Sequence, residues 1–297
     1  MEKKAANKRE EQALTGLFGH PVEHSLSPLF MNYIFRTLRI KALYAAFDIT
    51  PEYIKDALTS LKILNFVGVN VTIPFKRTAF EYADVLTEDS RTIGAVNCLV
   101  NRAGMLKGYN TDHLGFIAPL EHRNVPLKGS TVLLIGCGGT ARSALYALVR
   151  KGVENVRLLN RTKKNARHFI TWSSEKLGFS AISLIGWGEA LTQPRLDEAD
   201  LIVNTTPVGM FPHMEANPLH GDLTLSHRHT VYDLIYNPWK TALLRKAERE
   251  GAIAINGFEM LILQGLHSLA LWFPEQREDF FGLRERVIRY VKGQRKG

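Results

Sequence analysis

The sequence predicts an α/β fold of two domains: an N-terminal α/β domain with a mixed sheet, then a Rossmann-type, doubly wound domain. Apolar runs of strand length alternate with amphipathic segments of helix length along the whole chain. A length of 297 residues exceeds one typical domain. A polar, proline-containing stretch at 124–129 separates two halves with different patterns.

In the N-terminal half, strands are predicted at 14–18, 42–49 and 66–73. A helix is predicted to begin at Ser27-Pro28, with Ser27 as N-cap and Pro28 at the first helical position, and Thr50-Pro51 begins another. Runs at 95–100 and 105–109 flank Asn101-Arg102-Ala103-Gly104, a predicted hairpin turn. The hairpin is antiparallel, so the first sheet should be mixed.

In the C-terminal half, strands and helices alternate regularly, so right-handed crossovers and a parallel sheet are expected. Strands are predicted at 131–135, 155–159, 181–185, 200–203, 230–234 and 252–255, with helices at 141–150 and 163–177 between them. A further helix should run from Asp112 to about Glu121. We therefore expect one domain at 1–123 and a second at 124–257, with final helices over 258–297 packing back onto the first.

Composition and charge limit the classes of function. The hydrophobic fraction of 45% suits a globular core, and the net charge is +9. Basic residues are scattered except for enrichment from Arg284 through Lys296, which has the pattern of an exposed amphipathic helix. No interleaved aromatic residues mark a base-stacking surface. The charge thus favours small anionic ligands over nucleic acid.

The expected compartment is the cytoplasm. No leading apolar segment resembles a signal peptide, and the apolar tract at 260–273 is too short to span a bilayer. Cys98 and Cys137 form neither a disulfide framework nor a metal or redox motif. Oligomeric state stays open between monomer and homodimer.

Two apolar runs end in clusters of small polar residues, each with one ionisable group. They are Asn70-Val71-Thr72-Ile73-Pro74-Phe75-Lys76 and Asn110-Thr111-Asp112-His113-Leu114-Gly115. Loops that follow strands carry function in open α/β sheets, so we expect Lys76 and Asp112 to meet. They would form a proton-transfer pair, because the carboxylate keeps the ammonium charged until substrate arrives.

A glycine-rich turn predicts a dinucleotide site. The strand at 131–135 runs into Gly136-Cys137-Gly138-Gly139-Thr140-Ala141, and a helical run follows. In this G-x-G-x-x-A pattern Gly136 allows a tight turn, Gly138 lets phosphates approach the backbone, and Ala141 permits close helix packing. Backbone N–H groups of Gly139 and Thr140 would face the anion at the helix start. Cys137 is interpreted as a small filler, not a nucleophile.

The end of the next strand favours NADP over NAD. NAD enzymes usually place Asp or Glu there, to bind the ribose 2′-hydroxyl. This chain has Asn160-Arg161-Thr162, with two lysines beyond. A guanidinium pairs with a 2′-phosphate and a threonine hydroxyl adds a donor. Cations at a helix start also oppose the helix dipole, which suggests a ligand.

With these pieces in place, the chain resembles the NADP-dependent shikimate dehydrogenase family from about Leu14 to Arg289. Beyond the motifs given above, the resemblance rests, in order, on His24-Ser25-Leu26-Ser27-Pro28, Gly94-Ala95-Val96-Asn97, Asn204-Thr205-Thr206-Pro207-Val208-Gly209-Met210, Asp233-Leu234-Ile235-Tyr236-Asn237-Pro238, and Gly257-Phe258-Glu259-Met260 with Gln264. The order of these motifs is more specific than any one of them.

The resemblance implies reversible hydride transfer from NADPH to the ring ketone of 3-dehydroshikimate. Lys76 would protonate the developing alkoxide, and Asp112 would bind a substrate hydroxyl and orient Lys76. Whether Lys76 is the proton donor or chiefly an anchor stays open. By the same resemblance Ser25, Ser27 and Tyr236 would bind the carboxylate; Thr72, Asn97 and Gln264 would bind the ring hydroxyls; Met210 and Gly257 would line the nicotinamide pocket.

The chain departs from the family pattern at three places. Met31-Asn32 replaces a frequent His-Asn pair, which suggests changed helix packing. His113 stands where glycine is common, and Cys98 where threonine is frequent. None removes a group that the chemistry needs.

Other functions remain as alternatives. A quinate/shikimate dehydrogenase with broader substrate and cofactor use is the nearest. Tetrahydrofolate dehydrogenases share the layout but lack the ordered motifs. A non-catalytic NADP-binding regulator or a nucleic-acid binder would not need Lys76 and Asp112 together. No metal site is predicted, because the close pair His227 and His229 has no helical ligand spacing.

Overall fold

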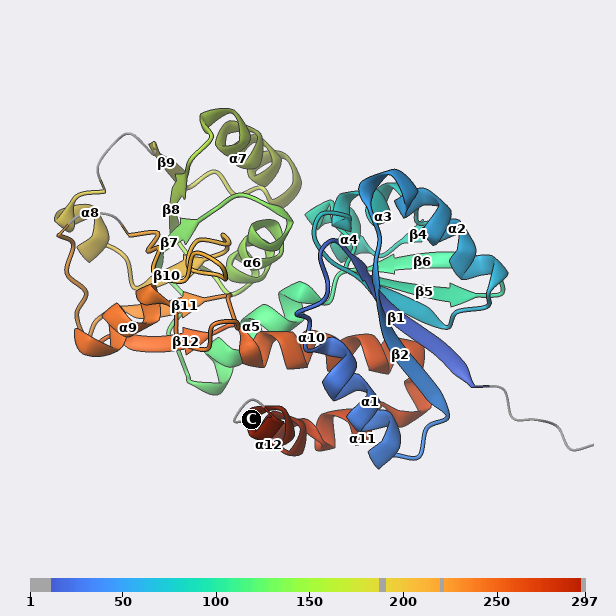
Figure 1. Ribbon diagram of the computed structural model, residues 1–297. Coiled ribbons are helices and arrows are strands. Elements are labelled where there is room, and N and C mark those ends of the chain that lie inside the picture. Colours follow the sequence, from blue (N-terminus) through green and yellow to red (C-terminus); the bar gives the residue numbers. More distant parts are fainter. Residues whose placement is uncertain (1–11, 187–190, 220–221, 295–297) are drawn as a thin grey trace, which may run out of the picture. The chain divides into compact units, whose positions relative to one another are not determined.

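The computed structural model describes residues 12–186, 191–219 and 222–294. The chain folds into two compact units (Figure 1). The first takes up Met1–Leu86, Val96–Tyr109 and Ser268–Gly297, and the second Thr87–Ala95 and Asn110–His267. The two-domain α/β fold is confirmed. The chain passes between the units at other residues than the predicted 123/124 and 257/258.

The first unit is built on a six-stranded mixed sheet of order β2-β1-β3-β5-β6-β4. Strand β1 runs parallel to β2 and β3, whereas β5 is antiparallel to both β3 and β6. The strands are β1 (Ala13–Gly19), β2 (Ala42–Asp48), β3 (Gly68–Val71), β4 (Val85–Leu86), β5 (Cys98–Arg102) and β6 (Met105–Tyr109). The predicted mixed sheet is confirmed, while β4 was not predicted.

The β5–β6 hairpin closes through two residues with left-handed backbone, Ala103 (φ 51°) and Gly104 (φ 82°). Such a turn matches the twist of the flanking strands. The side-chain oxygen of Asn101 accepts a hydrogen bond of 3.0 Å from the N–H of Gly104. The turn lies where the sequence predicted it, although β5 begins at Cys98, three residues later than expected.

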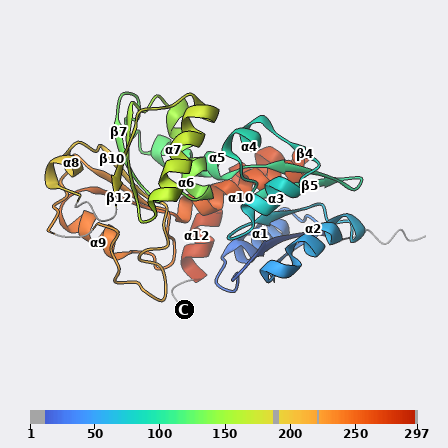
Figure 2. The ribbon, with the colours of Figure 1, turned by 90° about the horizontal axis from the view of Figure 1, so that it is seen from above.

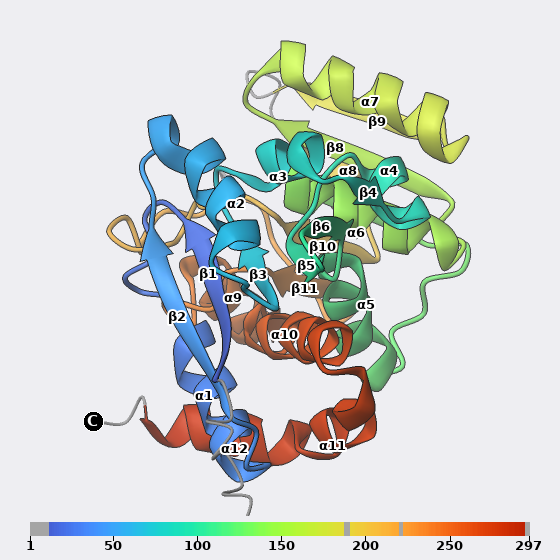
Figure 3. The same cartoon turned by 90° about the vertical axis from the view of Figure 1, so that its right-hand side faces the viewer.

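Helices cover both faces of this sheet. On one face α2 (Ile54–Ile63), preceded by η1 (Pro51–Tyr53), and α3 (Lys76–Tyr82) pack on an apolar core that includes Leu58, Val69 and Leu99. On the other lie α1 (Ser27–Thr37), α11 (Arg277–Gly282) and α12 (Arg284–Gln294), with η2 (Pro274–Gln276) before α11 (Figure 3). Helices α1 and α12 pack together, and the rings of Tyr33 and Tyr290 are stacked with their centroids 3.8 Å apart. Residues 268–294 thus belong to the first unit, whereas residues 258–267 belong to the second.

The start of α1 differs from the prediction. Leu26 occupies the N-cap position, Ser27 is the first helical residue and Pro28 the second, and no side chain caps the helix. The N–H of Ser27 instead donates to the hydroxyl oxygen of Ser25 at 3.2 Å. The prediction of Ser27 as N-cap was therefore wrong by one position, because Ser25 supplies the local acceptor.

The second unit is built on a six-stranded parallel sheet of order β12-β11-β10-β7-β8-β9. The strands are β7 (Thr131–Ile135), β8 (Asn155–Asn160), β9 (Ile182–Gly186), β10 (Leu201–Asn204), β11 (Thr230–Asp233) and β12 (Ile253–Asn256). Chain order runs outward in opposite directions from the β7/β10 pair, which is the order of a dinucleotide-binding doubly wound sheet. Ligands bind such sheets outside the carboxyl ends of the strands at that pair.

Helices lie on both faces of the parallel sheet (Figure 1, and from above in Figure 2). On one face α5 (Asp112–His122), α6 (Gly139–Arg150), α7 (Lys163–Leu177) and the first part of α10 (Phe258–Trp272) share a core with Leu134 and Val156. On the other, α8 (Gln193–Asp197) and α9 (Ala242–Arg249) pack over Leu133 and Val231.

Helix α4 (Glu88–Ile93) was not predicted, and it belongs to the second unit although the chain on both sides belongs to the first. The hydroxyl of Thr87 caps it by accepting from the N–H of Ser90, and Gly94 ends it with a φ of 72°. The indole N–H of Trp172, on α7, donates to the carbonyl of Thr92 at 2.8 Å. Six residues are too few to show helical periodicity, which is why the pattern escaped detection.

Candidate functional site

The lysine motif begins with a buried amide. Asn70, on β3, accepts a hydrogen bond of 3.0 Å from the hydroxyl of Tyr44. Its nitrogen donates to the carbonyl of Asn97 (3.2 Å) and the hydroxyl of Ser268 (2.8 Å). With 4% exposure Asn70 is enclosed, so its role is to hold three segments of the first unit together.

Backbone hydrogen bonds bring Thr72, Lys76 and Asn97 onto neighbouring segments at the carboxyl end of β3. The N–H of Phe75 bonds to the carbonyl of Thr72 at 2.8 Å, forming the turn that ends the strand. The carbonyl of Lys76 accepts from the N–H of Val96 at 3.0 Å, and that of Asn97 from Val71 at 2.9 Å. This turn ends the strand at Val71, before the predicted end at residue 73, and the strand begins at Gly68 instead of residue 66.

Lys76 is half-buried and is the first residue of α3. A helix N-terminus favours anions and disfavours cations. A lysine at this position therefore does not stabilise the helix through the helix dipole.

Ser25 and Ser27 lie close together before and within the first turn of α1. Ser25 is half-buried and Ser27 is 4% exposed. The hydroxyl oxygen of Ser25 already accepts from the N–H of Ser27. Its O–H hydrogen stays available to donate to an anion, because a hydroxyl both accepts and donates.

Asp112 is the first residue of α5, where the helix dipole favours a carboxylate, and it is 5% exposed. It belongs to the second unit and Lys76 to the first. That the two side chains meet remains a prediction.

The glycine turn has the geometry that the sequence predicted. Gly136 has a φ of 100°, and a Cβ there would lie 2.5 Å from the hydroxyl of Thr205. At Gly138, the N-cap position of α6, a Cβ would meet no atom within 4 Å. Ala141 is fully buried in the core. The N–H groups at the start of a helix have no partners within it, so this open side of the turn suits a phosphate.

Positive charge gathers beside this turn. Strands β7 and β8 are parallel neighbours, with Ile135 opposite Leu159. The turn and Arg161 therefore follow adjacent strand ends. Arg161, Thr162 and two lysines are exposed, the first turn of α7 holds no acid, and Thr162 makes no capping bond. The amide of Asn160 donates to the carbonyl of Thr162 at 3.0 Å, which fixes this bend.

A buried polar network holds the loops after β10 and β11. The carboxylate of Asp233 accepts hydrogen bonds from the amide of Asn204 (3.0 Å), the hydroxyl of Thr241 (2.6 Å) and the N–H of Ile235 (3.2 Å). Asp233 is fully buried, and this burial raises its pKa to about 6, against the lowering effect of those donors. The sequence showed Asn204 and Asp233 in motifs but gave no sign that they pair.

Four more predicted site residues lie on or beside these loops and on α10. Met210 is 45% exposed and Tyr236 is half-buried. At Gly257 a Cβ would lie 2.0 Å from the carbonyl oxygen of Leu234, so only glycine fits there. The amide nitrogen of Gln264 donates to the carbonyl of Leu261 at 2.7 Å.

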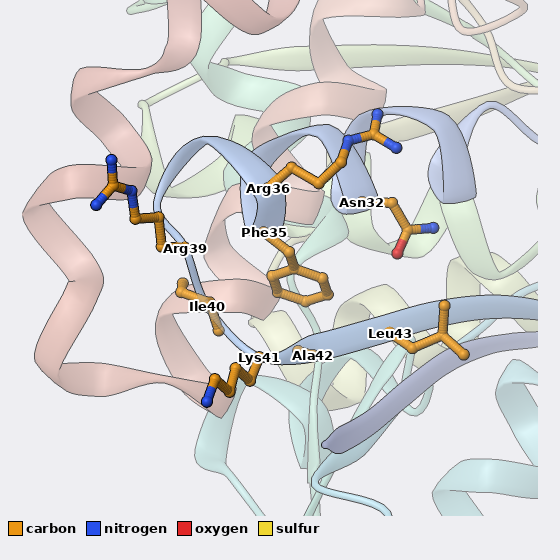
Figure 4. Close-up of a pocket in the computed structure, with 8 residues that line it drawn as sticks. All are labelled: Asn32, Phe35, Arg36, Arg39, Ile40, Lys41, Ala42 and Leu43. Carbon is orange, nitrogen blue, oxygen red and sulfur yellow. The ribbon is translucent and has the colours of Figure 1, made fainter. Parts of the chain in front are cut away.

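One pocket, of about 510 Å³, lies in the first unit at the end of α1 (Figure 4). It is lined by Asn32, Phe35, Arg36, Arg39, Ile40, Lys41, Ala42 and Leu43, none of them a predicted site residue. The amide of Asn32 exchanges hydrogen bonds with the N–H (2.9 Å) and carbonyl (2.8 Å) of Tyr44. It thereby caps the edge of strand β2, while Met31 is fully buried.

The remaining features bear on metal, thiol and membrane chemistry. Within 12–186, 191–219 and 222–294, no three His, Cys, Asp or Glu residues gather as a metal site. One ring nitrogen of His229 accepts from the N–H of Ser226 at 2.9 Å. Burial raises the pKa of Cys137, which makes its thiol less reactive. Across the same residues, the helices are too short or too polar to span a bilayer.

Two family models match the chain. One, described as the shikimate dehydrogenase substrate binding domain, matches residues 17–99, and the other, shikimate / quinate 5-dehydrogenase, matches residues 120–207. A curated relative from Methanothermobacter thermautotrophicus, named shikimate dehydrogenase (NADP(+)), is 42% identical over 259 residues, which are 87% of this chain and 90% of the relative.

Solved structures agree with these matches. A shikimate dehydrogenase in complex with NADP+ superposes with a TM-score of 0.82 at 36% identity, covering 89% of this chain and 90% of the other. A second, from Thermus thermophilus in complex with NADP(H) and shikimate, gives 0.79 at 33% identity and covers 94% and 99%.

Proposed function

The chain belongs to the shikimate dehydrogenase family, and from this premise we propose that it catalyses the reversible, NADPH-dependent reduction of 3-dehydroshikimate to shikimate. The enzyme is then an NADP-dependent oxidoreductase that acts on a CH–OH group. One observation carries the proposal: a single chain matches both the substrate-binding and the dehydrogenase model, and a relative of that name is 42% identical over 87% of it.

The residues around the glycine turn fit NADP. The open backbone at Gly138 would receive the pyrophosphate, and the backbone N–H groups of Gly139 and Thr140 would donate hydrogen bonds to it. The small side chain of Ala141 is buried in the core behind this turn. Arg161, with Asn160 and Thr162 at the end of β8, would hold the 2′-phosphate. No acidic residue stands in the first turn of α7 to repel that phosphate.

The substrate residues are assigned by type and position. Ser25, Ser27 and Tyr236 would donate hydrogen bonds to the substrate carboxylate, while Thr72, Asn97 and Gln264 would bind ring hydroxyls. Met210 and Gly257 would line the space for the nicotinamide ring. We assign substrate binding to residues 1–123 and 258–297 and cofactor binding to 124–257, with Tyr236 as a substrate residue contributed by the second range.

Lys76 and Asp112 are assigned to the proton transfer that accompanies hydride transfer. When bound, NADPH supplies the hydride that reduces the ring ketone. The Lys76 ammonium would donate a proton to the oxygen that becomes the hydroxyl, and Asp112 would hold a neighbouring hydroxyl and orient the lysine. In the reverse direction Lys76 would receive the proton.

A spectrophotometric assay tests the function. Purified protein with shikimate and NADP+ should show rising absorbance from NADPH, whereas NAD+ should support a much lower rate. Comparable rates with quinate, or with NAD+, would instead favour the broader quinate/shikimate dehydrogenase, the activity that the second family model also names. If neither shikimate nor quinate is oxidised with either NADP+ or NAD+, both the proposed function and this alternative are refuted.

The expected setting follows from the same assignment. We propose that the enzyme works in the cytoplasm on small molecules, as a monomer or a homodimer, without nucleic acid as a partner. Neither Cys98 nor Cys137 forms a disulfide, as a reducing compartment requires. Light scattering of the purified protein would decide between the two assembly states.

A further inference from the structure

Asp89 lies in the first turn of α4 and faces side chains from two other helices of the second unit. The hydroxyl of Tyr146, on α6, donates a hydrogen bond to its Oδ1. The Nε2 atom of His113, on α5, lies 3.7 Å from its Oδ2. The rings of His113 and Tyr146 meet edge to face, with centroids 5.1 Å apart. One carboxylate thus joins α4, α5 and α6.

Both partners of Asp89 are buried. The His113 side chain is 10% exposed, and Tyr146 is 5% exposed. Desolvation lowers the pKa of His113, which keeps the ring neutral near pH 7. A neutral ring carries one N–H, and the nearby carboxylate favours its placement on Nε2.

The other ring nitrogen of His113, Nδ1, is buried with no hydrogen-bond partner among the described residues. A buried acceptor without a donor costs stability. Packing stability alone therefore does not explain a histidine at this place. Its neighbour in the chain is Asp112, the carboxylate on which the proposed reaction depends.

Asn110, two residues before Asp112, is held as well. The amide nitrogen of Asn110 donates to the carbonyl of Ala95 at 3.0 Å, just beyond α4. Its oxygen accepts from the N–H of His113 (3.4 Å) and the hydroxyl of Ser143, on α6 (3.2 Å). The start of α5 is thus held on both sides of Asp112: at His113 by Asp89 of α4, and at Asn110 by Ser143 of α6 and by Ala95, just after α4.

We propose that Asp89, acting through His113 and Tyr146, is a positioning residue for Asp112. The proposal rests on the function proposed above. In this role Asp89 takes no part in the reaction itself. It holds the first turn of α5, and with it Asp112, in a fixed position and orientation. A displacement of about 1 Å at a catalytic group can cost a hundredfold in rate, so a remote anchor of this kind is measurable.

The test compares two substitutions of Asp89 with one of its neighbour. Asp89→Ala removes the anchor, and we expect kcat/KM for shikimate to fall by about tenfold or more, chiefly in kcat. Asp89→Asn keeps an oxygen that accepts from Tyr146, so it should restore most of that loss. Glu88→Ala is the matched control: Glu88 is an exposed carboxylate in the same helical turn, and its loss should change nothing.

Calorimetric titration of NADP+ separates positioning from damage to the fold. Its dissociation constant should stay within about twofold of wild type in all three variants, because only the substrate step depends on Asp112. Should Asp89→Ala fail to fold, Tyr146→Phe replaces it, since this change removes only the hydroxyl that holds the carboxylate. It should lower kcat/KM in the same way.

Three results would overturn the positioning role: full kcat/KM in Asp89→Ala or in its replacement Tyr146→Phe, an equal loss of NADP+ affinity, or an Asp89→Asn as impaired as Asp89→Ala. These differ from a failure of the proposed function. If wild-type protein does not oxidise shikimate, the function falls and the positioning role with it. If wild type is active and Asp112→Asn is not, the proposed function holds, and the Asp89 variants then test only the positioning role of Asp89.

Discussion

The side-chain amide of Asn204 donates a hydrogen bond of 3.0 Å to the fully buried carboxylate of Asp233. This pair joins the ends of neighbouring strands β10 and β11. The loops that follow carry Met210 and Tyr236, which are assigned to the nicotinamide and to the substrate. The pair thus connects the stability of the sheet to the shape of the proposed site.

The first prediction concerns the pH dependence that Asp233 creates. Its pKa is about 6 in the folded protein, against 3.8 as the ordinary value. The folded state therefore binds this proton more tightly, so the stabilising contribution is complete below pH 3.8 and is lost as pH rises through 6. Lowering the pH from 7 to 5 should therefore raise the free energy of unfolding by about 1 kcal/mol through this group.

Urea unfolding of wild type and Asp233→Asn at both pH values measures this. The variant should be more destabilised relative to wild type at pH 5 than at pH 7. Asp197→Asn, at an exposed carboxylate, should show no such change. A destabilisation by Asp233→Asn that is the same at both pH values would contradict the raised pKa.

A second prediction separates two glycines of one turn. In Gly138→Ala the new methyl group meets open space, so thermal stability should be unchanged, but the methyl would block the approach of the pyrophosphate. NADP+ affinity should fall by about tenfold or more, which corresponds to at least ~1.4 kcal/mol. Titration calorimetry and a thermal melt test this together.

In Gly136→Ala, by contrast, the φ of 100° and the contact with Thr205 should destabilise the fold itself, by about 1–3 kcal/mol. The melting temperature should therefore drop in the absence of cofactor. If both variants melt like wild type, the strain assigned to Gly136 is wrong.

The third prediction tests the cofactor preference. Arg161→Ala should raise KM for NADP+ by about 10- to 100-fold, because a charge-assisted bond to phosphate is lost. KM for NAD+, which has no 2′-phosphate, should change little. Lys176→Ala, an exposed cation at the other end of α7, serves as control and should affect neither. A parallel rise for both cofactors would remove Arg161 from the 2′-phosphate site.

The fourth prediction concerns Lys76. Lys76→Ala should lower kcat by about 10²–10⁴-fold, the usual contribution of a positioned acid or base, and leave NADPH affinity nearly intact. Arg77→Ala removes the adjacent cation, which is exposed and paired with Glu81 at 2.7 Å, and activity should stay within about twofold. Equal losses of turnover and NADPH binding in Lys76→Ala would point to misfolding.

The sequence predicted the six strands of the second sheet and the helices α6 and α7 closely, because local periodicity and turn residues mark them, whereas α8 and α9 were not predicted. Strand β7 and helix α7 have the predicted bounds, and the glycine turn lies between strand and helix as expected. The first sheet was harder. Strand β3 stops at Val71 because the N–H of Phe75 bonds to Thr72, a turn that an apolar run does not reveal.

By itself, then, the sequence determined the fold class, the family and the candidate residues, since these depend on which residue types follow one another. Tertiary structure decided how those residues are supported. Asp233 became a buried partner of Asn204, Gly257 the only residue that fits against Leu234, and Asp89 the link between three helices. Such roles depend on burial and on contacts between segments that are far apart in the sequence, and local sequence patterns do not indicate which distant segments will be in contact.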